Sequence, residues 1–486
     1  MTFSDGYQHK RVTVMGLGSF GGGVGVTRWL CEQGAIVTVT DSLPESSLES
    51  ALGEIAGLIA SGNVKLCLGS HRDTDFTSTD LVVANPAVPT PWSNAYLRLA
   101  ADAGVPITTE IRLVCERLPT RASVVGVTGS AGKSTVAAMT AHLLRSVLGE
   151  DRVVFGGNIG GSLLARVASL TAEDAVVLEL SSAMLYWLGR GVGEPKGWNG
   201  PGWKGFSPSV GVLTNIADNH ADWHGSFEHY ASSKLNIFRF GDTSTDAAIV
   251  AESSATMQGR FGSLGVRPRL VGLDIDTGIA GAIRAVLTLP GDHNVLNGVT
   301  AVAAVQSLLT RRGGPSLGRL TSTNAADPLS LASSLADFRG LPHRLEYVTS
   351  RGGVRYFNDS KSTTPQSCLL ALRAFDQPSK QPNIHLIAGG YDKHSDLTPV
   401  ADAAGGLAGL YTVGVTGPAL HALAQARFPE RVFSCGSLHV AVQMASQRAR
   451  EGDIILLSPA CASWDQFKNY EARGERFCEL ALAMPV

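Results

Sequence analysis

Residues 122–136, Ala-Ser-Val-Val-Gly-Val-Thr-Gly-Ser-Ala-Gly-Lys-Ser-Thr-Val, decide the fold. An apolar run leads into a glycine-rich turn and then an apolar-periodic segment, which predicts a buried strand, a loop and a helix. Backbone N–H groups in such a turn can surround an anion, the helix N-terminus adds partial positive charge, and Lys133 and Ser134 suit phosphate oxygens and Mg²⁺. The alternative is a chance Gly-Lys-Ser in a surface turn. Because strand and helix flank the turn in the required order, we expect a nucleoside triphosphate site.

Composition and charge bound the class of protein. The chain has 486 residues, of which 44% are hydrophobic and 17% charged, with a net charge of −2. These values predict a globular protein of two to four domains, and they give no electrostatic basis for a nucleic-acid partner. The seven cysteines are scattered without a C-x-x-C pair, which favours reduced thiols. With a polar N-terminus and no apolar run of spanning length, we expect a cytoplasmic protein without membrane insertion.

The N-terminal segment carries a dinucleotide-type pattern. A strand, the sequence Gly16-Leu17-Gly18-Ser19-Phe20-Gly21, a helix to about Gln33 and a second strand ending at Asp41 follow one another. This order predicts a βαβ unit that contacts a pyrophosphate or ribose, without specifying NAD. A later strand runs into Asn85-Pro86, a loop at a strand's carboxyl end, where ligands bind in such sheets. The strands expected in this segment are residues 11–15, 35–40, 81–84 and 106–110.

The alternation of strands and helices continues to the C-terminus. We expect an α/β protein with three domains, 1–114, 115–338 and 339–486. Residues 189–208 are rich in glycine, proline and tryptophan, and either a functional loop or a surface insertion fits them. Residues 313–334 read as a linker or edge. Beyond the first domain the expected strands are residues 175–180, 209–215, 354–358, 385–388, 409–413 and 453–457.

Three side chains downstream of the glycine-rich loop can carry chemistry. Glu179 ends a buried strand, where a carboxylate could hold Mg²⁺ on triphosphate oxygens; a solvated glutamate is the alternative. His220, in Asp218-Asn219-His220-Ala221-Asp222-Trp223-His224, could ligate a second metal or orient a phosphate, although a lone histidine is more often structural. Lys234 lies on an expected helix, and its sequence context alone predicts a surface lysine.

A series of short motifs gives the chain a family resemblance. The motifs, in order, are GVTGSAGKST (126–135), GGNIG (156–160), ELSS (179–182), DNHADWH (218–224) with SSKLNIF (232–238), LPGDHNVLN (289–297), GLPHR (340–344), NDSKST (358–363), GGYDK (389–393) and SPACASWDQF (458–467). Over essentially its whole length the chain therefore resembles the Mur ligase family, most closely the branch that adds D-glutamate.

The resemblance implies an architecture and a reaction. It implies an N-terminal Rossmann-like domain for a UDP-sugar, a central P-loop ATPase-type domain and a C-terminal Rossmann-like domain for the amino acid. The implied reaction joins D-glutamate to UDP-N-acetylmuramoyl-L-alanine through an acyl phosphate, in peptidoglycan precursor synthesis. It uses ATP and Mg²⁺, and the chain is expected to act as a monomer.

The resemblance also assigns the ATP and metal ions to named residues. Ser134 and Glu179 would bind one Mg²⁺ and His220 a second, and Lys234 would become a carboxylate-like metal ligand if carbamylated. With Lys133, the residues Glu179, His220 and Lys234 would be catalytic. The implied ATP-binding residues are Gly129, Gly132, Lys133, Ser134, Thr135, Asn294, Asn297, Arg344 and Asp359.

The two other substrates fall on two further groups of residues. Lys393 is the natural partner for one carboxylate of the amino acid. The implied UDP-substrate residues are Gly18, Asp41, Asn85 and Asn158. The implied amino-acid residues are Thr363, Lys393, Ser463 and Tyr470.

Departures from the family pattern leave other functions open. Trp464 and Tyr470 replace residues common in the family, so a ligase for another amino acid such as L-glutamate is one alternative. Ala87 replaces a glycine and would be strained if its φ were positive. A non-catalytic nucleotide-binding scaffold is a second alternative, which the joint presence of Glu179, His220, Lys234 and Lys393 argues against. A dehydrogenase is a third, but it would leave the phosphate loop without a task.

Overall fold

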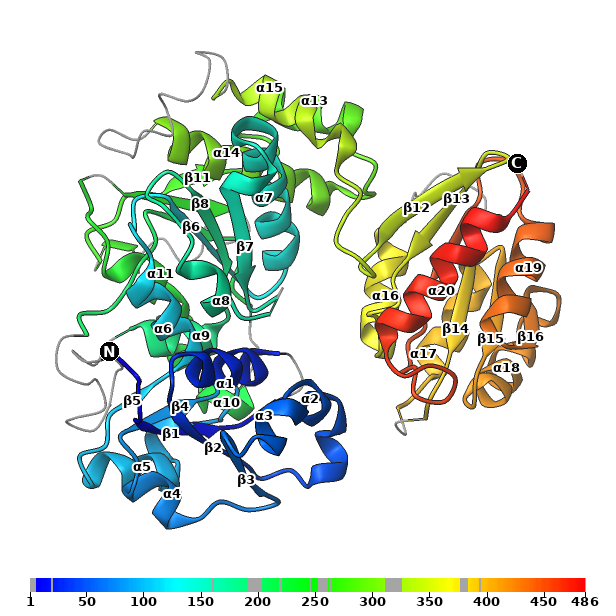
Figure 1. The fold of residues 1–486 in the computed structure, drawn as a ribbon. Coiled ribbons are helices and arrows are strands. Elements are labelled where there is room, and N and C mark those ends of the chain that lie inside the picture. The colour runs from blue at the N-terminus through cyan, green and yellow to red at the C-terminus, as the bar shows by residue number, and fades with distance from the viewer. Residues whose placement is uncertain are drawn as a thin grey trace. The chain divides into compact units, whose positions relative to one another are not determined.

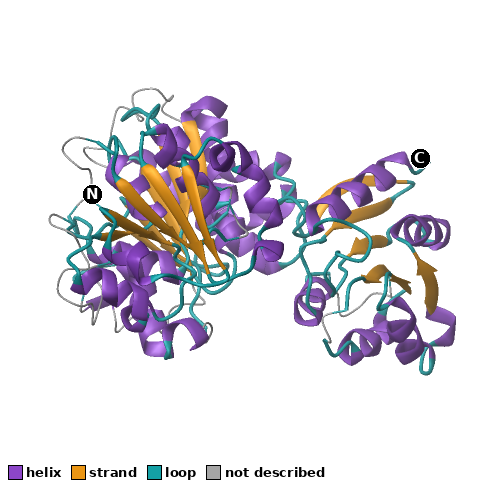
Figure 2. Cartoon of the chain, turned by 60° about the horizontal axis from the view of Figure 1, so that its bottom comes forward, coloured by secondary structure: helices purple, strands orange, loops and turns teal. Residues whose placement is uncertain are grey.

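The described residues of the computed structural model form three β-sheets (Figure 1). By internal contacts the chain divides into two compact units, Met1–Ile283 with Leu296–Leu335, and Arg284–Val295 with Ala336–Val486. Strands form inner layers and helices lie outside them (Figure 2), which confirms the predicted α/β class. The structure describes residues 6–18, 21–159, 161–189, 203–217, 221–244, 246–251, 261–262, 264–310, 326–375, 383–392 and 395–485.

The first sheet is parallel and has the order β3-β2-β1-β4-β5. Strand order reverses at β1, so the loops after β1 and β4 meet where ligands bind in such sheets. The predicted strands β1 and β4 are confirmed residue for residue, whereas β5 is shorter than expected because Glu110 already begins a helix. The elements are β1 (Arg11–Met15), α1 (Gly22–Glu32), β2 (Ile36–Asp41), α2 (Glu49–Glu54), α3 (Ala56–Ala60), β3 (Val64–Leu68), α4 (Asp73–Thr77), β4 (Leu81–Ala84), α5 (Ala95–Asp102), β5 (Ile107–Thr108) and α6 (Glu110–Arg117).

The central sheet is also parallel, with the order β11-β10-β9-β6-β8-β7. β6 lies between β8 and β9, so the loops after these three strands come together. The elements are β6 (Val124–Thr128), α7 (Lys133–Leu148), β7 (Val153–Gly157), α8 (Leu164–Val167), β8 (Ala175–Glu179), α9 (Ser182–Leu188), β9 (Val210–Leu213), α10 (Ala221–His224), α11 (Phe227–Arg239), β10 (Ala247–Ala251), β11 (Arg269–Val271), α13 (Thr277–Val286), α14 (Asp292–Thr310) and α15 (Pro328–Ser333).

The third sheet has the order β12-β13-β17-β14-β15-β16, with β12 antiparallel at one edge. Phe357 and Leu386 pack toward one core and Tyr356 and Ile455 toward another, so each face of the sheet is buried. The elements are β12 (Glu346–Arg351), β13 (Val354–Asn358), α16 (Pro365–Arg373), β14 (Ile384–Gly389), α17 (Thr398–Ala403), β15 (Gly409–Val413), α18 (Gly417–Gln425), β16 (Val432–Gly436), α19 (Leu438–Arg448), β17 (Ile454–Leu457) and α20 (Tyr470–Ala483).

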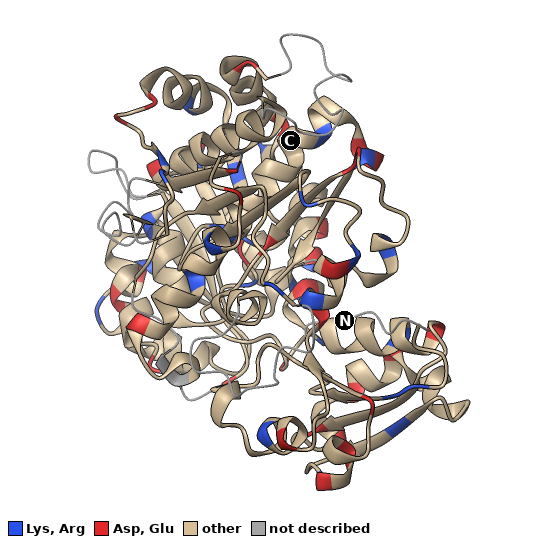
Figure 3. Ribbon diagram, turned by 90° about the vertical axis from the view of Figure 1, so that its left-hand side faces the viewer, with Lys and Arg blue, Asp and Glu red and all other residues tan. Residues whose placement is uncertain are grey.

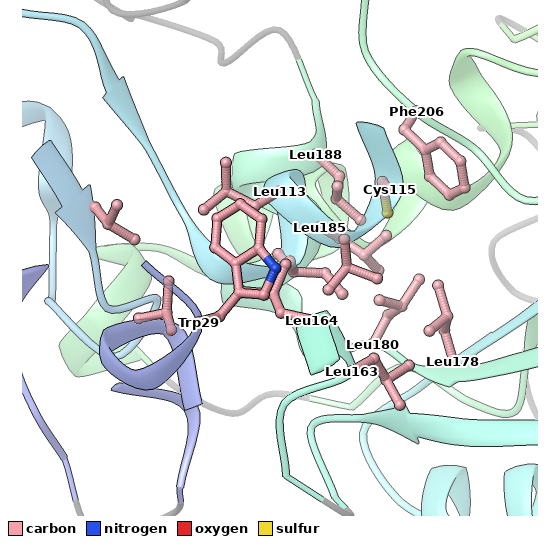
Figure 4. Packing of buried hydrophobic residues seen from close by; sticks show 14 of the residues in the cluster. Trp29, Leu113, Cys115, Leu163, Leu164, Leu178, Leu180, Leu185, Leu188 and Phe206 are labelled. Carbon is pink, nitrogen blue, oxygen red and sulfur yellow. The ribbon is translucent and has the colours of Figure 1, made fainter. Parts of the chain in front are cut away.

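The first two sheets share one hydrophobic core. Trp29 of α1 and Leu113 of α6 belong to the same buried cluster as Leu164 and Leu185 of the central region (Figure 4). This shared core explains why contacts do not separate these two sheets into different units. The predicted boundaries at 114/115 and 338/339 stay predictions.

Two stretches that looked irregular in the sequence have different outcomes. Residues 328–333, inside the expected linker, form helix α15 with Asp327 as its N-cap, so the linker prediction was wrong there. Residues 190–202 of the predicted long loop lie outside the described part. No helix among the described residues is long and apolar enough to cross a membrane. Acidic and basic positions are interspersed along the ribbon (Figure 3), in keeping with the net charge of −2.

Candidate active site

The phosphate loop between β6 and α7 has the backbone that its glycines allow. Gly129 has a φ of 153° and Gly132, the residue before α7, a φ of 77°. A Cβ on Gly129 would lie 1.9 Å from Thr214 Oγ1, and one on Gly132 would lie 2.8 Å from Asn297 Oδ1. Gly129 therefore requires glycine on steric as well as conformational grounds, and Gly132 on conformational grounds.

A polar pair that the sequence analysis missed holds this loop in place. The side-chain oxygen of Asn215 accepts hydrogen bonds from the backbone N–H groups of Ser130 (3.0 Å) and Ala131 (2.8 Å). Thr214 Oγ1 donates to the carbonyl of Ala131 (2.6 Å). Both residues follow the last apolar residue of β9, so their place at a strand end was the available signal.

Two lysines contact the carbonyls of the loop. Lys133 Nζ donates to Ser130 O (3.1 Å), and Lys234 Nζ donates to Gly129 O (2.8 Å). Lys234 is 1% exposed and lies 4.7 Å from the ring centre of Tyr230, so the prediction of a surface lysine was wrong. Burial, with Lys133 adding repulsion, holds the pKa of Lys234 well below its ordinary value. Burial therefore disfavours the charged form of this amine.

Glu179 lies at the end of β8, between the ends of β6 and β7. It pairs in register with Val127 on one side and Gly157 on the other, and it is 1% exposed, so the alternative of a solvated glutamate was wrong. Asn158 Nδ2 donates to Glu179 Oε1 (3.0 Å). The structure thus places Asn158, expected at the muramoyl group, on the candidate metal ligand.

The donor atoms around Glu179 fit a hard divalent cation. Glu179 Oε2 is buried without a hydrogen-bond partner, which is costly unless a cation or donor approaches it. Ser134, the second residue of α7, is buried too and offers a hydroxyl oxygen. Among the described residues no three His, Cys, Asp or Glu side chains gather around one point. An ion here would therefore combine few protein oxygens with phosphate oxygens, as Mg²⁺ does.

The predicted UDP-substrate residues of the first sheet come together. Asp41, at the end of β2, accepts the N–H groups of Leu17 and Leu43 (2.9 Å each). Asn85, after β4, donates from Nδ2 to Gly16 O (3.2 Å), and a Cβ on Gly18 would lie 2.9 Å from that same nitrogen.

The loop that begins at Asn85 tolerates its departure from the family pattern. Asn85 Oδ1 accepts the N–H of Ala87 (2.9 Å), and Ala87 does not have a positive φ. The strain considered for an alanine here is therefore absent.

Four of the predicted nucleotide residues lie on α14 and in the third sheet. Asn297 borders Gly132, as described, and Asn294 Nδ2 donates to Pro290 O (2.7 Å). Asp359, after β13, accepts from Ser458 Oγ (2.7 Å), and burial raises its pKa to about 6. Arg344 is exposed, and its charge acts on Asp359 in the opposite direction.

Three of the predicted amino-acid residues, Thr363, Ser463 and Tyr470, lie at the carboxyl end of the third sheet. Thr363 lines a small cleft with Tyr391, Asp392, Ser395, Leu397, Thr416, Ala460 and Cys461. Ser463 is buried, and the backbone oxygen of Tyr470 accepts from Ser360 Oγ (2.8 Å).

Arg473 organises these loops and was missed by the sequence analysis. Its guanidinium donates to the carbonyls of Ser360 (2.9 Å), Cys461 (3.0 Å) and Ala462 (3.1 Å). The side chain is buried, and burial lowers its pKa to about 10. Nothing local in the sequence of α20 marks this role.

The structure thus assembles three groups of predicted residues. Gly129, Gly132, Lys133, Ser134, Thr135, Asn158, Glu179, Lys234 and Asn297 surround the ends of the central strands and the start of α7; Gly18, Asp41 and Asn85 meet in the first sheet; and Arg344, Asp359, Thr363, Ser463 and Tyr470 belong to the third. His220 and Lys393 lie outside the described residues.

Comparisons with known proteins agree with this division. Residues 10–109 match the MurD-like N-terminal domain of Mur ligases, 127–274 the Mur ligase middle domain and 343–461 the Mur ligase glutamate ligase domain. The chain is 34% identical to the UDP-N-acetylmuramoylalanine–D-glutamate ligase of Pelotomaculum thermopropionicum, over 98% of each chain. It is 36% identical to the enzyme of that name from Roseiflexus, over 96% of this chain and 97% of the other.

A solved structure supports the fold. The crystal structure of UDP-N-acetylmuramate-alanine ligase MurC from Thermotoga maritima matches with a TM-score of 0.53 at 18% identity, over 98% of this chain and all of the other. The three family models and the full-length relatives lead to one assignment: the chain belongs to the Mur ligase family, in its MurD-like branch.

Proposed function

We propose that this chain is an ATP-dependent ligase that joins D-glutamate to UDP-N-acetylmuramoyl-L-alanine. The observation that carries the proposal is the central site, where Lys133 and the buried Lys234 hold adjacent carbonyls of one phosphate loop, with the buried Glu179 at the end of the neighbouring strand. A site that only anchored a nucleotide would not need a buried amine of lowered pKa. The proposed substrates are those in the name of the relatives that match over nearly the whole chain.

The reaction has two bond-forming steps. A carboxylate oxygen of the substrate's terminal alanine attacks the γ-phosphorus of ATP, the bond from phosphorus to the bridging oxygen breaks, and ADP leaves. The amine of D-glutamate then attacks the acyl carbon, loses a proton, and expels phosphate from a tetrahedral intermediate. Charge develops on phosphoryl oxygens in the first step, so preorganised N–H donors and lysines at the loop lower its barrier.

The residues of the central site divide these tasks. The N-terminus of α7 and Lys133 bind the triphosphate, and Asn215 with Thr214 keeps the loop in shape. Ser134 and Glu179 would hold Mg²⁺, which neutralises phosphate charge and polarises the bond that breaks. Asn158 orients Glu179 through its bond to Oε1. Carbamylation of Lys234 and a metal-binding role for His220 belong to the same proposal.

The first and third sheets would supply the other substrates. Gly18, Asp41 and Asn85 form the proposed contact surface for the UDP group. Thr363, Lys393, Ser463 and Tyr470 would hold D-glutamate, while Asn294, Asn297, Arg344 and Asp359 complete the nucleotide site. We propose that the enzyme works as a monomer in the cytoplasm, where its ATP is available.

Phosphate release by the purified protein tests the proposal. Mg-ATP and UDP-N-acetylmuramoyl-L-alanine are supplied with D-glutamate, L-glutamate or no amino acid, and the product mass is measured. We expect turnover with D-glutamate and a product heavier by one glutamyl residue. Turnover only with L-glutamate would assign a different acceptor to the cleft that Thr363 lines. ATP binding without turnover under any condition would favour a scaffold.

A further inference from the structure

Trp223 and His224, at the end of α10, connect two regions that the proposed function assigns to different substrates. One is the loop after β4, which begins at Asn85 in the proposed UDP-substrate site. The other is the segment after β8, which directly follows Glu179 in the proposed metal site. Neither Trp223 nor His224 has a role in the mechanism above.

Trp223 is bonded to the loop after β4 from both its side chain and its backbone. Its indole Nε1–H donates to Pro86 O (3.1 Å), and its carbonyl accepts the N–H of Thr90 (3.2 Å). The ring is 7% exposed and packs edge-on against Trp92 at 5.8 Å between centroids. Pro86 directly follows Asn85, so these bonds fix the loop one residue from the proposed substrate contact.

His224 faces the segment after β8. Its Nε2 lies 2.9 Å from Ser182 Oγ, and its Nδ1 lies 2.9 Å from Nδ1 of His229. His224 is 2% exposed and Ser182 is 5% exposed. Both ring nitrogens are thus engaged in a dry environment, where losing one hydrogen bond is costly. Ser182 is three residues from Glu179, so the ring fixes the segment that carries this carboxylate.

The same histidine also reaches the phosphate loop. Its ring packs edge-on against Tyr230 at 5.3 Å, and the Tyr230 hydroxyl lies 2.8 Å from Ser130 Oγ. The ring of Tyr230 in turn lies 4.7 Å from Lys234 Nζ. Through these contacts, the two neighbouring residues of α10 join the loop after β4, the segment after β8 and the phosphate loop.

We propose that Trp223 and His224 are positioning residues that set the placement of the UDP-substrate loop relative to the phosphate and metal site. The inference rests on the proposed function and adds to it. An in-line attack on the γ-phosphate requires the carboxylate and the triphosphate to be held in one geometry, and small misplacement is costly in rate. Trp223 fixes the loop proposed to bind the UDP substrate, which carries the carboxylate. His224 fixes the segment after β8, beside the proposed triphosphate and metal site.

Conservative variants separate the two halves of this pair. Trp223→Phe keeps a ring and removes the N–H that bonds Pro86, and we expect KM for the UDP substrate to rise about 3–10-fold with KM for ATP unchanged. His224→Phe and Ser182→Ala each remove the same hydrogen bond, and we expect each to lower kcat by about 3–10-fold. Both variants lose the His224–Ser182 bond, and His224→Phe also loses the bond to His229, so the double variant should fall no further than His224→Phe alone.

A matched control lies in the other unit. Tyr411→Phe removes a buried hydrogen bond of the same 2.9 Å length, between the Tyr411 hydroxyl and His385 Nδ1. We expect a similar fall in melting temperature for this variant with unchanged kinetic constants. If Trp223→Phe, His224→Phe and Ser182→Ala behave like this control, their role is only structural and the inference is overturned.

A binding measurement distinguishes failure of this inference from failure of the proposed function. If the wild-type protein does not turn over, the proposed function fails, and binding then tests the inference by calorimetry with UDP-N-acetylmuramoyl-L-alanine alone. In that case Trp223→Phe should weaken binding of this nucleotide about 3–10-fold relative to Tyr411→Phe. Equal affinities would overturn the positioning role of Trp223.

Discussion

The carboxyl ends of the central and the third sheet are organised by opposite means. In the central sheet, a glycine turn with positive φ at Gly129 and Gly132 forms the loop, and side chains secure its backbone. In the third sheet, one buried guanidinium, that of Arg473, gathers the carbonyls of two loops. There the loop after β17 even contains a non-glycine residue, Ala460, at a φ of 61°.

This difference follows from the proposed ligands. A triphosphate is met by N–H groups and cations, so its loop must expose backbone donors, and only glycines permit that conformation. Loops around an amino acid must instead present side chains from several strands, and a buried cation is one way to hold such loops. The residues that shape the first kind of site are neighbours in sequence. The second kind depends on a residue that joins loops far apart in sequence.

The largest expected effect concerns Lys234, the distant member of the central site. We expect Lys234→Met to lower kcat about 10³-fold, because it removes the amine that holds Gly129 O and the proposed metal ligand. The rate of phosphate release measures this change in kcat. Arg117→Met, which alters a cation away from the phosphate loop, is the control and should keep its turnover. A Lys234→Met enzyme that retains a tenth of wild-type kcat would remove Lys234 from the central site's chemistry.

Carbon dioxide sharpens the test of Lys234. Burial lowers the pKa of this amine, and a neutral amine is the form that CO₂ can carbamylate. We expect wild-type turnover to fall in CO₂-depleted buffer and to recover with added bicarbonate. Turnover that is independent of CO₂ would argue that Lys234 acts as an amine.

The next effect concerns Arg473 and the stability of the third sheet. We expect Arg473→Met to lower the free energy of unfolding by about 3 kcal/mol, since it leaves buried carbonyls of two loops without donors. Urea denaturation measures this change. Arg476→Met, on the same helix but 49% exposed and paired with Glu479, should stay within about 0.5 kcal/mol of wild type. Equal losses in the two variants would mean that Arg473 is not the organising residue.

A smaller effect is expected from the glycine turn itself. Gly129→Ala places a Cβ 1.9 Å from Thr214 Oγ1 at a φ of 153°, so we expect it to cost about 2 kcal/mol of stability and to weaken ATP binding. Gly57→Ala, in α3 with no atom within 4 Å of the added Cβ, should be neutral or slightly stabilising. Thermal unfolding and ATP titration compare the two. Normal ATP affinity in Gly129→Ala would break the argument that this turn needs glycine.

Features encoded by neighbouring residues could be predicted from the sequence, and features that depend on distant residues could not. Strands β1, β4, β13 and β15 were predicted residue for residue, because apolar runs bounded by turn residues mark buried strands. Strands β3, β7, β10, β11 and β16 were missed, and so was the antiparallel edge strand β12. Their burial depends on neighbours that are distant in sequence.

Site residues show this limit most clearly. Lys133 and Glu179 could be found because each lies at the end of a buried strand or in a glycine turn. Lys234 could not be placed, since a lysine on a helix looks exposed until α11 packs under the phosphate loop. Arg473 gave no signal, because it joins the nearby carbonyls of Cys461 and Ala462 to that of Ser360, which is more than a hundred residues away.

The smallest expected effect concerns Asp359 in the third sheet. Burying its ionised carboxylate lowers the free energy of unfolding. Burial raises its pKa from 3.8 to about 6, so the folded state binds more protons than the unfolded state between these values. Stability from this group is therefore full below pH 3.8 and is lost as pH rises through 6.

We expect the free energy of unfolding to fall by about 1 kcal/mol more between pH 5 and pH 7 in wild type than in Asp359→Asn. Urea denaturation at the two pH values measures this, with Asp402→Asn on α17 as an exposed control. The same pH dependence in all three proteins would mean that Asp359 is not held at a cost, and the carboxyl end of the third sheet would then rest on Arg473 alone.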